Sequence, residues 1–509
     1  MQEGEQIASV DLGSNSFHML IVRMEAGQLQ VVDRMKEMVR LAGGLDEDGC
    51  LSAEAMERGL ECLQRFGQRL SGMPRNRVRV VGTNTLRAAK NGATFIRRAQ
   101  RAIGYPVEII NGREEARLIY LGVASSDVPV DGRRLVVDVG GGSAELIIGQ
   151  GLEPLRMESA PLGCVRLTAS HFSDGKYGRT RLIRAERRAA LELMRYRRAY
   201  RKMGWERAVG SSGTARSLAA VAKANGWGDG SLTLDGMNQI RKAVLKAGRL
   251  DKLSLDGLSD DRKPVFVGGL VAMRAIFEAL GIEQMAISDG ALREGLIYDW
   301  VKRDGVDDVR ERTVARLQKR FKVDVEHADR VARTAAALWQ QVAVDWGAGS
   351  DETSESLPLA TWLDVAARLH EVGLAISHSG YHRHGAYMLE HADMPGLTRL
   401  AQAVVSSLVH AHRRKFKASR FESLDEIRRP LVMRMAVILR LAVLLHRDRG
   451  DGETESADIG PDQLKLTANG KRLVLKFADG WLEAHPLTVA DLEREQCYVA
   501  NGGFKLRFS

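Results

Sequence analysis

An aspartate followed by a turn rich in glycine and serine occurs twice in the N-terminal half of the chain. The first copy reads Asp-Leu-Gly-Ser-Asn-Ser over 11–16, and the second reads Asp-Val-Gly-Gly-Gly-Ser over 138–143. Apolar, β-branched residues flank each copy, which predicts a β-hairpin with the turn at its tip. A turn of small residues lets backbone N–H groups approach a phosphate closely. The aspartate beside it is suited to hold a hydrated cation.

The candidate phosphate-binding residues are the small and polar residues of these tips and of two later turns. They are Gly13, Ser14, Asn15, Ser16, Thr83, Gly141, Gly142, Ser143 and Gly213. A tight turn without a ligand would explain the glycines, but it does not require an aspartate before them. Gly213 belongs to a Gly-Ser-Ser-Gly-Thr run over 210–214 that opens a predicted helix, where backbone N–H groups favour an anion.

Carboxylates near the second tip are candidate ligands for Mg²⁺. Asp138 and Glu145 are close enough in sequence to share one metal shell, and we expect Asp11 to support it through water. Mg²⁺ prefers one or two carboxylates together with phosphate oxygens and waters. The pattern therefore predicts Mg²⁺ as the cofactor.

Arg87 follows a predicted strand over 77–81, in the same turn as Thr83. A guanidinium there could form a fork over the terminal phosphate of a substrate. The commoner fate of an arginine is a surface cation. We predict the phosphate-binding role.

The elements around these residues predict α/β domains, because strands alternate with amphipathic helices. The expected strands are 77–81, 106–110, 205–209 and 284–287, and the expected helices are 51–70, 93–103 and 179–201. Helices then cover a sheet, and ligands bind beyond the carboxyl ends of its strands. After a charged hinge over 304–312 the pattern becomes helical, with expected helices over 328–344, 359–374 and 431–445. An acidic loop over 450–456 and short strands such as 472–477 follow.

Composition limits the class of protein. The chain has 509 residues, 44% hydrophobic and 28% charged, as in ordinary soluble proteins. Four scattered cysteines give no metal or redox motif, and the acidic N-terminus is unlike a signal peptide, so we predict a cytoplasmic protein. The net charge of +10 favours a polyanionic ligand. Only 6% of residues are aromatic, so we expect no nucleic acid; peripheral membrane contact stays open.

Six motifs in one order resemble the bacterial exopolyphosphatase/guanosine pentaphosphate phosphatase family of the actin-like ATPase and sugar kinase superfamily. They occupy 11–16, 82–87, 112–119, 138–145, 210–214 and 288–295. The resemblance implies two ribonuclease-H-like (actin-like ATPase) α/β domains, a helical HD-like domain and a small α+β C-terminal module. We place these domains at 1–122, 123–303, 304–447 and 448–509. The resemblance also implies a homodimer.

The resemblance further implies that Glu115 is the catalytic residue of the Glu114-Glu115 pair. A carboxylate can orient a water in line with the leaving oxygen of a phosphoanhydride and accept its proton. Both glutamates lie early in a predicted helix, where either one could merely compensate the helix dipole.

The helical region resembles the HD-type metal phosphohydrolases at His327 and at the His370-Glu371 pair. Those enzymes use a His-Asp pair and a later aspartate, whereas this chain has Glu371 and Val443. We therefore expect no working metal centre there. A basic group in this region either lines a path for a polyanion or is a solvated charge run: His378, His382, His384, His412, Arg413, Arg414 and Lys415.

The function predicted first is Mg²⁺-dependent release of terminal orthophosphate from inorganic polyphosphate by water attack. The shared motifs leave open a second substrate, the 5′ end of guanosine pentaphosphate. An ATP-dependent small-molecule kinase or actin-like ATPase is a third reading, but no clear base-holding pattern supports it. A non-catalytic polyanion-binding protein is disfavoured by the joint presence of Glu115, Asp138 and Glu145.

Overall fold

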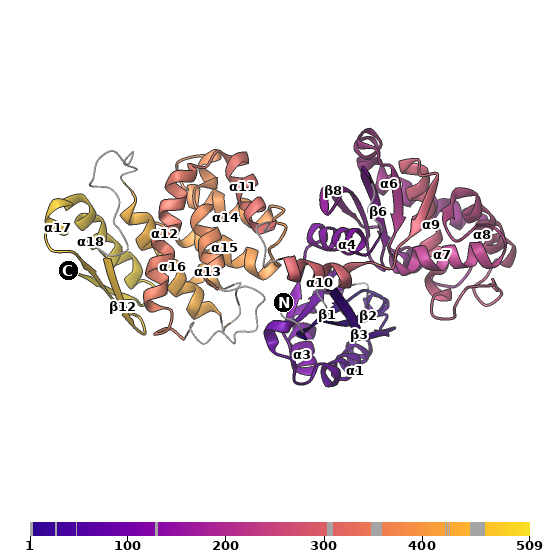
Figure 1. Cartoon of the computed structure of the whole chain (residues 1–509), viewed down its shortest axis with the longest axis horizontal. Coiled ribbons are helices and arrows are strands. Elements are labelled where there is room, and N and C mark those ends of the chain that lie inside the picture. The colour runs from indigo at the N-terminus through magenta and orange to yellow at the C-terminus, as the bar shows by residue number, and fades with distance from the viewer. Residues whose placement is uncertain are drawn as a thin grey trace. The chain divides into compact units, whose positions relative to one another are not determined.

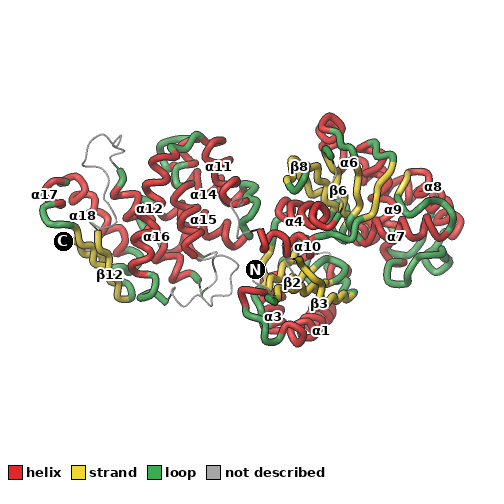
Figure 2. The backbone as a smooth tube through the Cα atoms, viewed as in Figure 1, coloured by secondary structure: helices red, strands yellow, loops and turns green. Residues whose placement is uncertain are grey.

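The computed structural model describes residues 4–25, 28–46, 48–127, 131–302, 309–347, 359–422, 424, 426, 428–447 and 464–509. The chain forms two compact units, Met1–Val306 and Asp307–Ser509 (Figures 1 and 2). The expected acidic loop over 450–456 and the first part of the expected hinge, 304–308, lie outside the described residues.

Two sheets of the N-terminal unit repeat one strand arrangement. The first has the order β3-β2-β1-β4-β5 and the second the order β10-β11-β9-β6-β7-β8. The strands are β1 Gln6–Leu12, β2 Phe17–Glu25, β3 Gln28–Glu37, β4 Val78–Gly82, β5 Val107–Ile109, β6 Arg133–Val139, β7 Ala144–Gln150, β8 Glu153–Ala160, β9 Arg207–Gly210, β10 Leu232–Thr233 and β11 Gln284–Ile287. In each sheet an antiparallel three-strand meander is joined by its first strand to a parallel partner, β4 or β9. This repetition is the duplicated α/β fold that the sequence predicts.

Helices pack on one face of each sheet. The first core contains α1 (Ala53–Leu70) and α3 (Gly92–Ile103), and the second contains α6 (Arg179–Met203), α7 (Gly213–Ala224), α8 (Leu234–Ala247) and α9 (Phe266–Leu280). The short helix α2 (Asn84–Ala88) follows β4 of the first sheet, and the short helix α5 (Cys164–His171) follows β8 of the second sheet. Ser52 caps α1 by accepting a hydrogen bond from the Ala55 amide at 3.3 Å, as its sequence position predicts.

Two helices lie between the sheets, α4 (Gly112–Ser126) and α10 (Leu292–Lys302) (Figure 1). They share one core with Val81 of the first sheet and Val136 of the second. Any Cβ at Gly122 or Gly295 would clash with the backbone of the facing helix, so these glycines permit the close crossing. Helix α4 runs through the expected boundary at 122/123, and α10 packs on β1 although it lies near the end of the expected second domain.

The C-terminal unit has helices followed by a small three-stranded sheet of order β12-β13-β14. Its elements are α11 Val309–Phe321, α12 Val325–Val342, α13 Leu359–Arg368, α14 Tyr381–His391, α15 Arg399–Ala411, α16 Arg429–Leu445, β12 Leu464–Asn469, β13 Arg472–Phe477, α17 Trp481–Ala484, α18 Pro486–Ala500 and β14 Lys505–Phe508. One hydrophobic core spans the helices and the sheet. The helix expected over 359–374 is wrong in its end: α13 stops at Arg368, and a turn precedes a short 3-10 helix over Val372–Ala375. Among the described helices, none is long and apolar enough to cross a bilayer.

Candidate active site

The two hairpin tips meet at a cleft of the N-terminal unit. All nine candidate phosphate-binding residues of the tips and turns line this cleft, and so do the four predicted carboxylates Asp11, Glu115, Asp138 and Glu145. A Cβ on Gly141 would lie 2.8 Å from the Ser14 Cβ, and one on Gly142 would clash with the Asn84 side chain. Glycine is therefore needed at the second tip, because the loops of the two sheets touch there.

Fixed hydrogen bonds shape the first tip. The carbonyl oxygens of Ser14 and Asn15 accept hydrogen bonds from the amides of Ala42 and Arg40, each at 2.8 Å. Thr85 Oγ1 donates to Ser14 Oγ at 2.7 Å. The Asn15 Nδ2 is buried and has no hydrogen-bond partner among the described residues. A buried donor left unsatisfied is costly, so this amide is suited to a ligand oxygen.

Asp138 and Glu145 are direct register partners on β6 and β7, so their side chains lie on one face of the hairpin. Ser211 Oγ donates to Asp138 Oδ2 at 2.6 Å, and Ser159 Oγ donates to Glu145 Oε1 at 2.8 Å. Each carboxylate is thus held by a serine from a neighbouring strand or loop.

The first turn of α4 separates the roles of its two glutamates. Asn111 caps the helix by accepting from the Glu114 amide at 2.8 Å. Glu114 receives two hydrogen bonds from Arg117, each 2.8 Å long, whereas Glu115 lines the cleft. Both glutamates lie in the first turn and both have an arginine partner, but only Glu115 lines the cleft.

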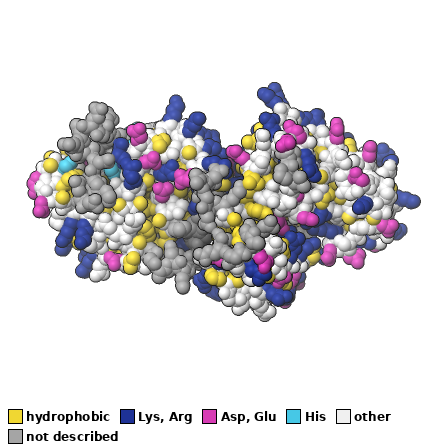
Figure 3. Space-filling model, viewed as in Figure 1, with side chains coloured by type: hydrophobic (Ala, Val, Ile, Leu, Met, Phe, Trp, Pro, Cys, Tyr) yellow, Lys and Arg dark blue, Asp and Glu magenta, His cyan; other side chains and the backbone are white. Residues whose placement is uncertain are grey.

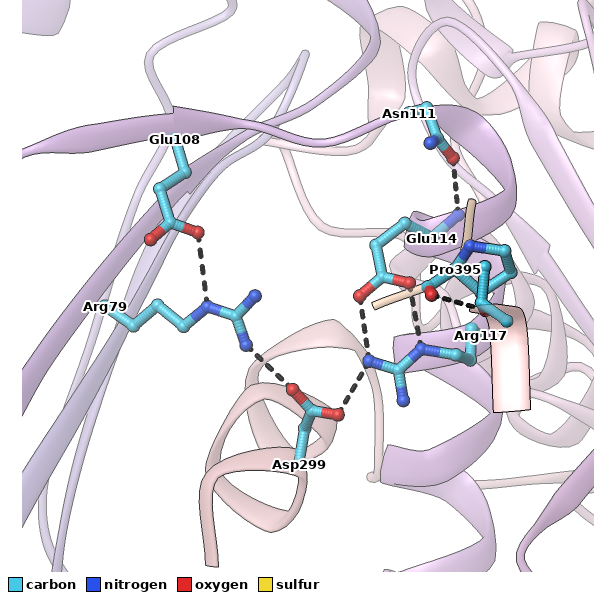
Figure 4. Close-up of polar contacts among 8 residues, drawn as sticks. Arg79, Glu108, Asn111, Glu114, Arg117, Asp299 and Pro395 are labelled. Carbon is cyan, nitrogen blue, oxygen red and sulfur yellow. Dashed lines mark hydrogen bonds and ion pairs between the residues drawn. The ribbon is translucent and has the colours of Figure 1, made fainter. Parts of the chain in front are cut away.

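A buried ion network continues from Glu114 across the unit (Figure 4). Arg117 donates to Asp299 of α10 at 2.6 Å, and Asp299 accepts from Arg79 of β4 at 2.9 Å. Arg79 also reaches Glu108 of β5 at 3.4 Å. The network ties α10 and α4 to the first sheet, directly behind the turn that presents Glu115.

Arg87 lies against Glu115. Both of its terminal nitrogens are 3.4 Å from Glu115 Oε2, and one donates to the Ile110 carbonyl at 2.6 Å. Arg87 is not among the described residues that line the cleft. The structure thus pairs it with the candidate base, and its predicted contact with phosphate stays a prediction.

Burial raises the pKa of all four cleft carboxyls. It raises the pKa of Asp11 to about 8, with the nearby Glu115 and Asp138 charges adding to the effect. The pKa of Glu115 rises to about 7 by burial and the Asp138 charge, against the lowering by Arg87. The pKa values of Asp138 and Glu145 also rise, mainly by burial. Clustered carboxylates of this kind ionise readily only beside positive charge.

The donor set fits a hydrated Mg²⁺ ion. Asp11 Oδ1 is buried and accepts no hydrogen bond from the part of the chain that the structure describes, and Asp138 and Glu145 share one face. Among the described residues, the cleft carboxylates do not form a compact group of three direct ligands. One or two carboxylates with waters and phosphate oxygens is the shell that Mg²⁺ prefers.

Four cleft residues were missed by the sequence prediction: His18, Arg216, Arg262 and Arg293. Arg293 lies in the 288–295 motif, and Arg216 follows Gly213 by one helical turn, so both had a signal. Arg262 lies against Gly213 from a loop without a distinctive pattern. These arginines add positive charge to the cleft wall, where phosphate groups are expected.

Comparison with known proteins identifies the same family as the sequence motifs do. Residues 20–304 match the Ppx/GppA phosphatase family model, and residues 309–496 match Ppx/GppA phosphatase, domain III. The chain belongs to the Ppx/GppA phosphatase family. It is therefore a phosphoanhydride hydrolase, and its N-terminal unit has the actin-like ATPase fold, as predicted.

Relatives differ in their substrates. A guanosine-5′-triphosphate,3′-diphosphate pyrophosphatase from Aeromonas hydrophila subsp. hydrophila is 39% identical over 495 residues, 97% of each chain. A solved exopolyphosphatase from Cytophaga hutchinsonii is 26% identical, with a TM-score of 0.54 over 60% of this chain and 99% of that chain. A solved exopolyphosphatase-like protein is 25% identical, with a TM-score of 0.53 over 59% and 99%. Family membership therefore establishes the reaction class, and both substrate classes occur among the relatives.

Proposed function

We propose that this chain hydrolyses the terminal 5′ phosphoanhydride of guanosine 5′-triphosphate 3′-diphosphate. The observation that carries the substrate is the 39% identity to the Aeromonas pyrophosphatase across 97% of both chains. The reaction is supported by the cleft, in which one carboxylate on a helix faces two phosphate-binding tips.

Glu115 is the proposed general base. Its carboxylate orients the attacking water and accepts a proton as the new P–O bond forms. The bond between the terminal phosphorus and the bridging oxygen breaks at the same time, so that orthophosphate is released and the bridging oxygen leaves with guanosine 5′-diphosphate 3′-diphosphate. The first tip, Gly13–Ser16, binds the terminal phosphoryl group, and Gly141–Ser143 binds its neighbour. Arg216, Arg262 and Arg293 offset the negative charge of both groups.

Asp138 and Glu145 would hold Mg²⁺, with Asp11 in support through water. When bound, Mg²⁺ would supply positive charge that polarises the phosphoryl oxygens and offsets the negative charge that develops on the bridging oxygen of the leaving group. The serines on Asp138 and Glu145 fix the orientation of both carboxylates before substrate arrives.

Inorganic polyphosphate is the second candidate substrate. The net charge of +10 and the structural likeness to the Cytophaga exopolyphosphatase favour it. On the face shown in Figure 3, the Lys and Arg side chains of the described residues are interspersed with Asp and Glu side chains.

The test compares kcat/KM for the two substrates in one Mg²⁺ buffer, with EDTA as the control. We expect the guanosine compound to be preferred at least tenfold, and EDTA to abolish phosphate release from both. A tenfold preference for polyphosphate would reverse the substrate assignment. Phosphate release that persists undiminished in Glu115→Gln would remove Glu115 from the reaction whatever the substrate.

A further inference from the structure

Three buried side chains converge in the C-terminal unit. They are His327 on α12 and the consecutive pair His370 and Glu371 in the turn after α13. Their nearest donor atoms all lie within 4.8 Å of one another. The three side chains are no more than 3% exposed.

The break in the helix expected over 359–374 is what brings His370 and Glu371 to one point. Consecutive side chains on an α-helix diverge by about 100°. In the turn that replaces the helix, His370 Nε2 is 4.0 Å from Glu371 Oε1, and the His327 and His370 rings are 5.7 Å apart. The irregular backbone therefore supports a cluster that a regular helix would separate.

The orientation of His370 is fixed from behind. Its Nδ1 lies 2.6 Å from the Ala367 carbonyl oxygen, and only a protonated Nδ1 can donate there. The Nε2 on the opposite side of the ring is then the nitrogen that carries the lone pair toward the cluster. A backbone hydrogen bond of this kind commonly fixes the tautomer of a metal-binding histidine.

One side of the cluster opens on a cavity of about 280 Å³. His327 and Glu371 contribute to its wall together with Tyr381, His412 and Arg413. The Arg413 guanidinium lies 4.5 Å from the centre of the Tyr381 ring. Further arginines line the same cavity: Arg414, Arg440, Arg447 and Arg494. Asp491 and Glu495 also line the cavity and pair with Arg440, Arg447 and Arg494. The described lining still holds more arginines than carboxylates, which suits an anion beside the cluster.

We propose that His327, His370 and Glu371 bind a divalent transition-metal ion, whose exchangeable water faces this cavity and is replaceable by phosphate. Two imidazoles favour Zn²⁺, Co²⁺ or Fe²⁺ over Mg²⁺. Three protein ligands with one open position suffice for such a site, and they do not require the later aspartate, where this chain has Val443. The sequence predicts no working metal centre here, whereas the structure brings three donor side chains together without the later aspartate. This site is independent of the substrate of the N-terminal unit.

The lining residues also account for part of the predicted basic group. His378, His412, Arg413 and Arg414 line the cavity, whereas His382, His384 and Lys415 are not among its described lining residues. His412 is held by its own backbone contact, Nδ1 to the Val409 carbonyl at 2.6 Å, and its Nε2 is 3.4 Å from the Tyr381 hydroxyl. His370 has the same kind of backbone contact, so it is the Tyr381 contact that assigns His412 to the cavity wall; the three residues whose donor atoms lie within 4.8 Å of one another do not include it.

The test uses the full chain, stripped with a chelator and returned to buffer with excess Mg²⁺ to occupy the N-terminal site. Co²⁺ is then added, and binding is measured by elemental analysis, visible d–d absorption and thermal denaturation. We expect one bound Co²⁺, new absorption bands and a higher Tm. Inorganic phosphate should shift the bands.

Variants locate the site. Glu371→Gln and His370→Ala should lose the bands and the Tm increase, whereas His378→Ala, an exposed residue of the same cavity, should keep them. If His370→Ala does not fold, Glu371→Gln and His327→Gln decide, because they change less volume. The proposal is overturned if the wild type binds no more Co²⁺ than Glu371→Gln. Bands that are unmoved by phosphate would overturn its phosphate ligand.

Discussion

Glu145 lies directly opposite Asp138 across the β6–β7 hairpin, and the same position in the β1–β2 hairpin is occupied by His18 opposite Asp11. His18 is held by Arg293 at 2.6 Å and by Ser16 Oγ at 2.8 Å. Burial and the Arg293 charge lower its pKa to about 2, so the imidazole stays neutral. The two related hairpins therefore differ in one register position: the second offers a pair of carboxylates, and the first offers one.

This difference predicts that Mg²⁺ dependence resides in the second hairpin. Glu145→Gln should raise the Mg²⁺ concentration for half-maximal activity by about 10–100-fold, because it removes a charged ligand. Ser159→Ala should give a smaller rise, since it only frees the Glu145 carboxylate to rotate. The measurement is a Mg²⁺ titration of initial rates. Glu158→Gln, on the same strand as Ser159 but outside the cleft lining, is the control. An equal effect in the control would contradict the assignment.

Substitution of the two neighbouring glutamates of α4 should have different effects, one on kcat and the other on the free energy of unfolding. Glu115→Gln should lower kcat by roughly 10²–10⁴, because it removes the base. It should change the unfolding midpoint less than Glu114→Gln, because the Glu115–Arg87 contact is 3.4 Å long whereas the Glu114–Arg117 bonds are 2.8 Å. Glu114→Gln leaves Arg117 with Asp299 as its remaining partner in a buried network, and should lower the free energy of unfolding by on the order of 3 kcal/mol. Urea unfolding and rates per folded molecule separate the two. Loss of kcat without loss of stability in Glu114→Gln would invert the roles.

Sequence reasoning places the cleft well because its signals are local. The turns around Gly13, Gly141 and Gly213 each follow a strand. The parallel pairing of β6 with β9 brings Gly141 and Gly213 to one end of the second sheet, and Gly13 reaches the same cleft from the first sheet. Without the family resemblance, the sequence does not show which of Glu114 and Glu115 is catalytic. The ion network that occupies Glu114 depends on Asp299, which lies 182 residues beyond Arg117. The Glu114–Arg117 spacing, one helical turn, was the available local hint.

The sequence also did not predict the roles of His18 and Arg262 in the cleft or the end of α13. His18 follows Asp11 by the same interval as Glu145 follows Asp138, so superposing the two hairpins would have found it. Arg262 comes from an irregular loop and is placed only by tertiary packing against Gly213. No proline or glycine at Arg368 predicts the end of α13 there. The turn after α13 is instead stabilised by buried polar contacts, such as the one between His370 and the Ala367 carbonyl, which the sequence does not reveal.

The Arg87–Glu115 contact predicts a pH effect. The pKa of Glu115 is raised to about 7, and Arg87 opposes that rise. Because a base must be ionised, kcat should increase as pH rises through this value. Arg87→Gln removes the lowering charge, raises the pKa further and should move the acidic limb to higher pH. In a kcat–pH profile, the loss of kcat in Arg87→Gln relative to the wild type should be largest near pH 6 and smallest above pH 8, because a single carboxyl group becomes ionised over this range.

Arg87→Lys is the matched control for charge, because it keeps the cation and loses the guanidinium fork. It should restore most of the wild-type limb. A loss of kcat in Arg87→Gln that is uniform across pH would instead favour the predicted contact of Arg87 with a substrate phosphate.

The contact between the two tips predicts that Gly141 sets the width of the cleft. In Gly141→Ala the added methyl would stand 2.8 Å from Ser14 Cβ and 3.3 Å from Val165 Cγ2, so the tips must separate. Since a shift of about 1 Å in a catalytic arrangement costs roughly 100-fold, kcat/KM should fall on that order for both substrates. Gly178→Ala is the control, because its Cβ would meet nothing within 4 Å and its φ of −80° suits alanine. Initial rates and thermal unfolding of both variants check this, and a Gly141→Ala enzyme with wild-type kcat/KM would show that the tips already move apart during turnover.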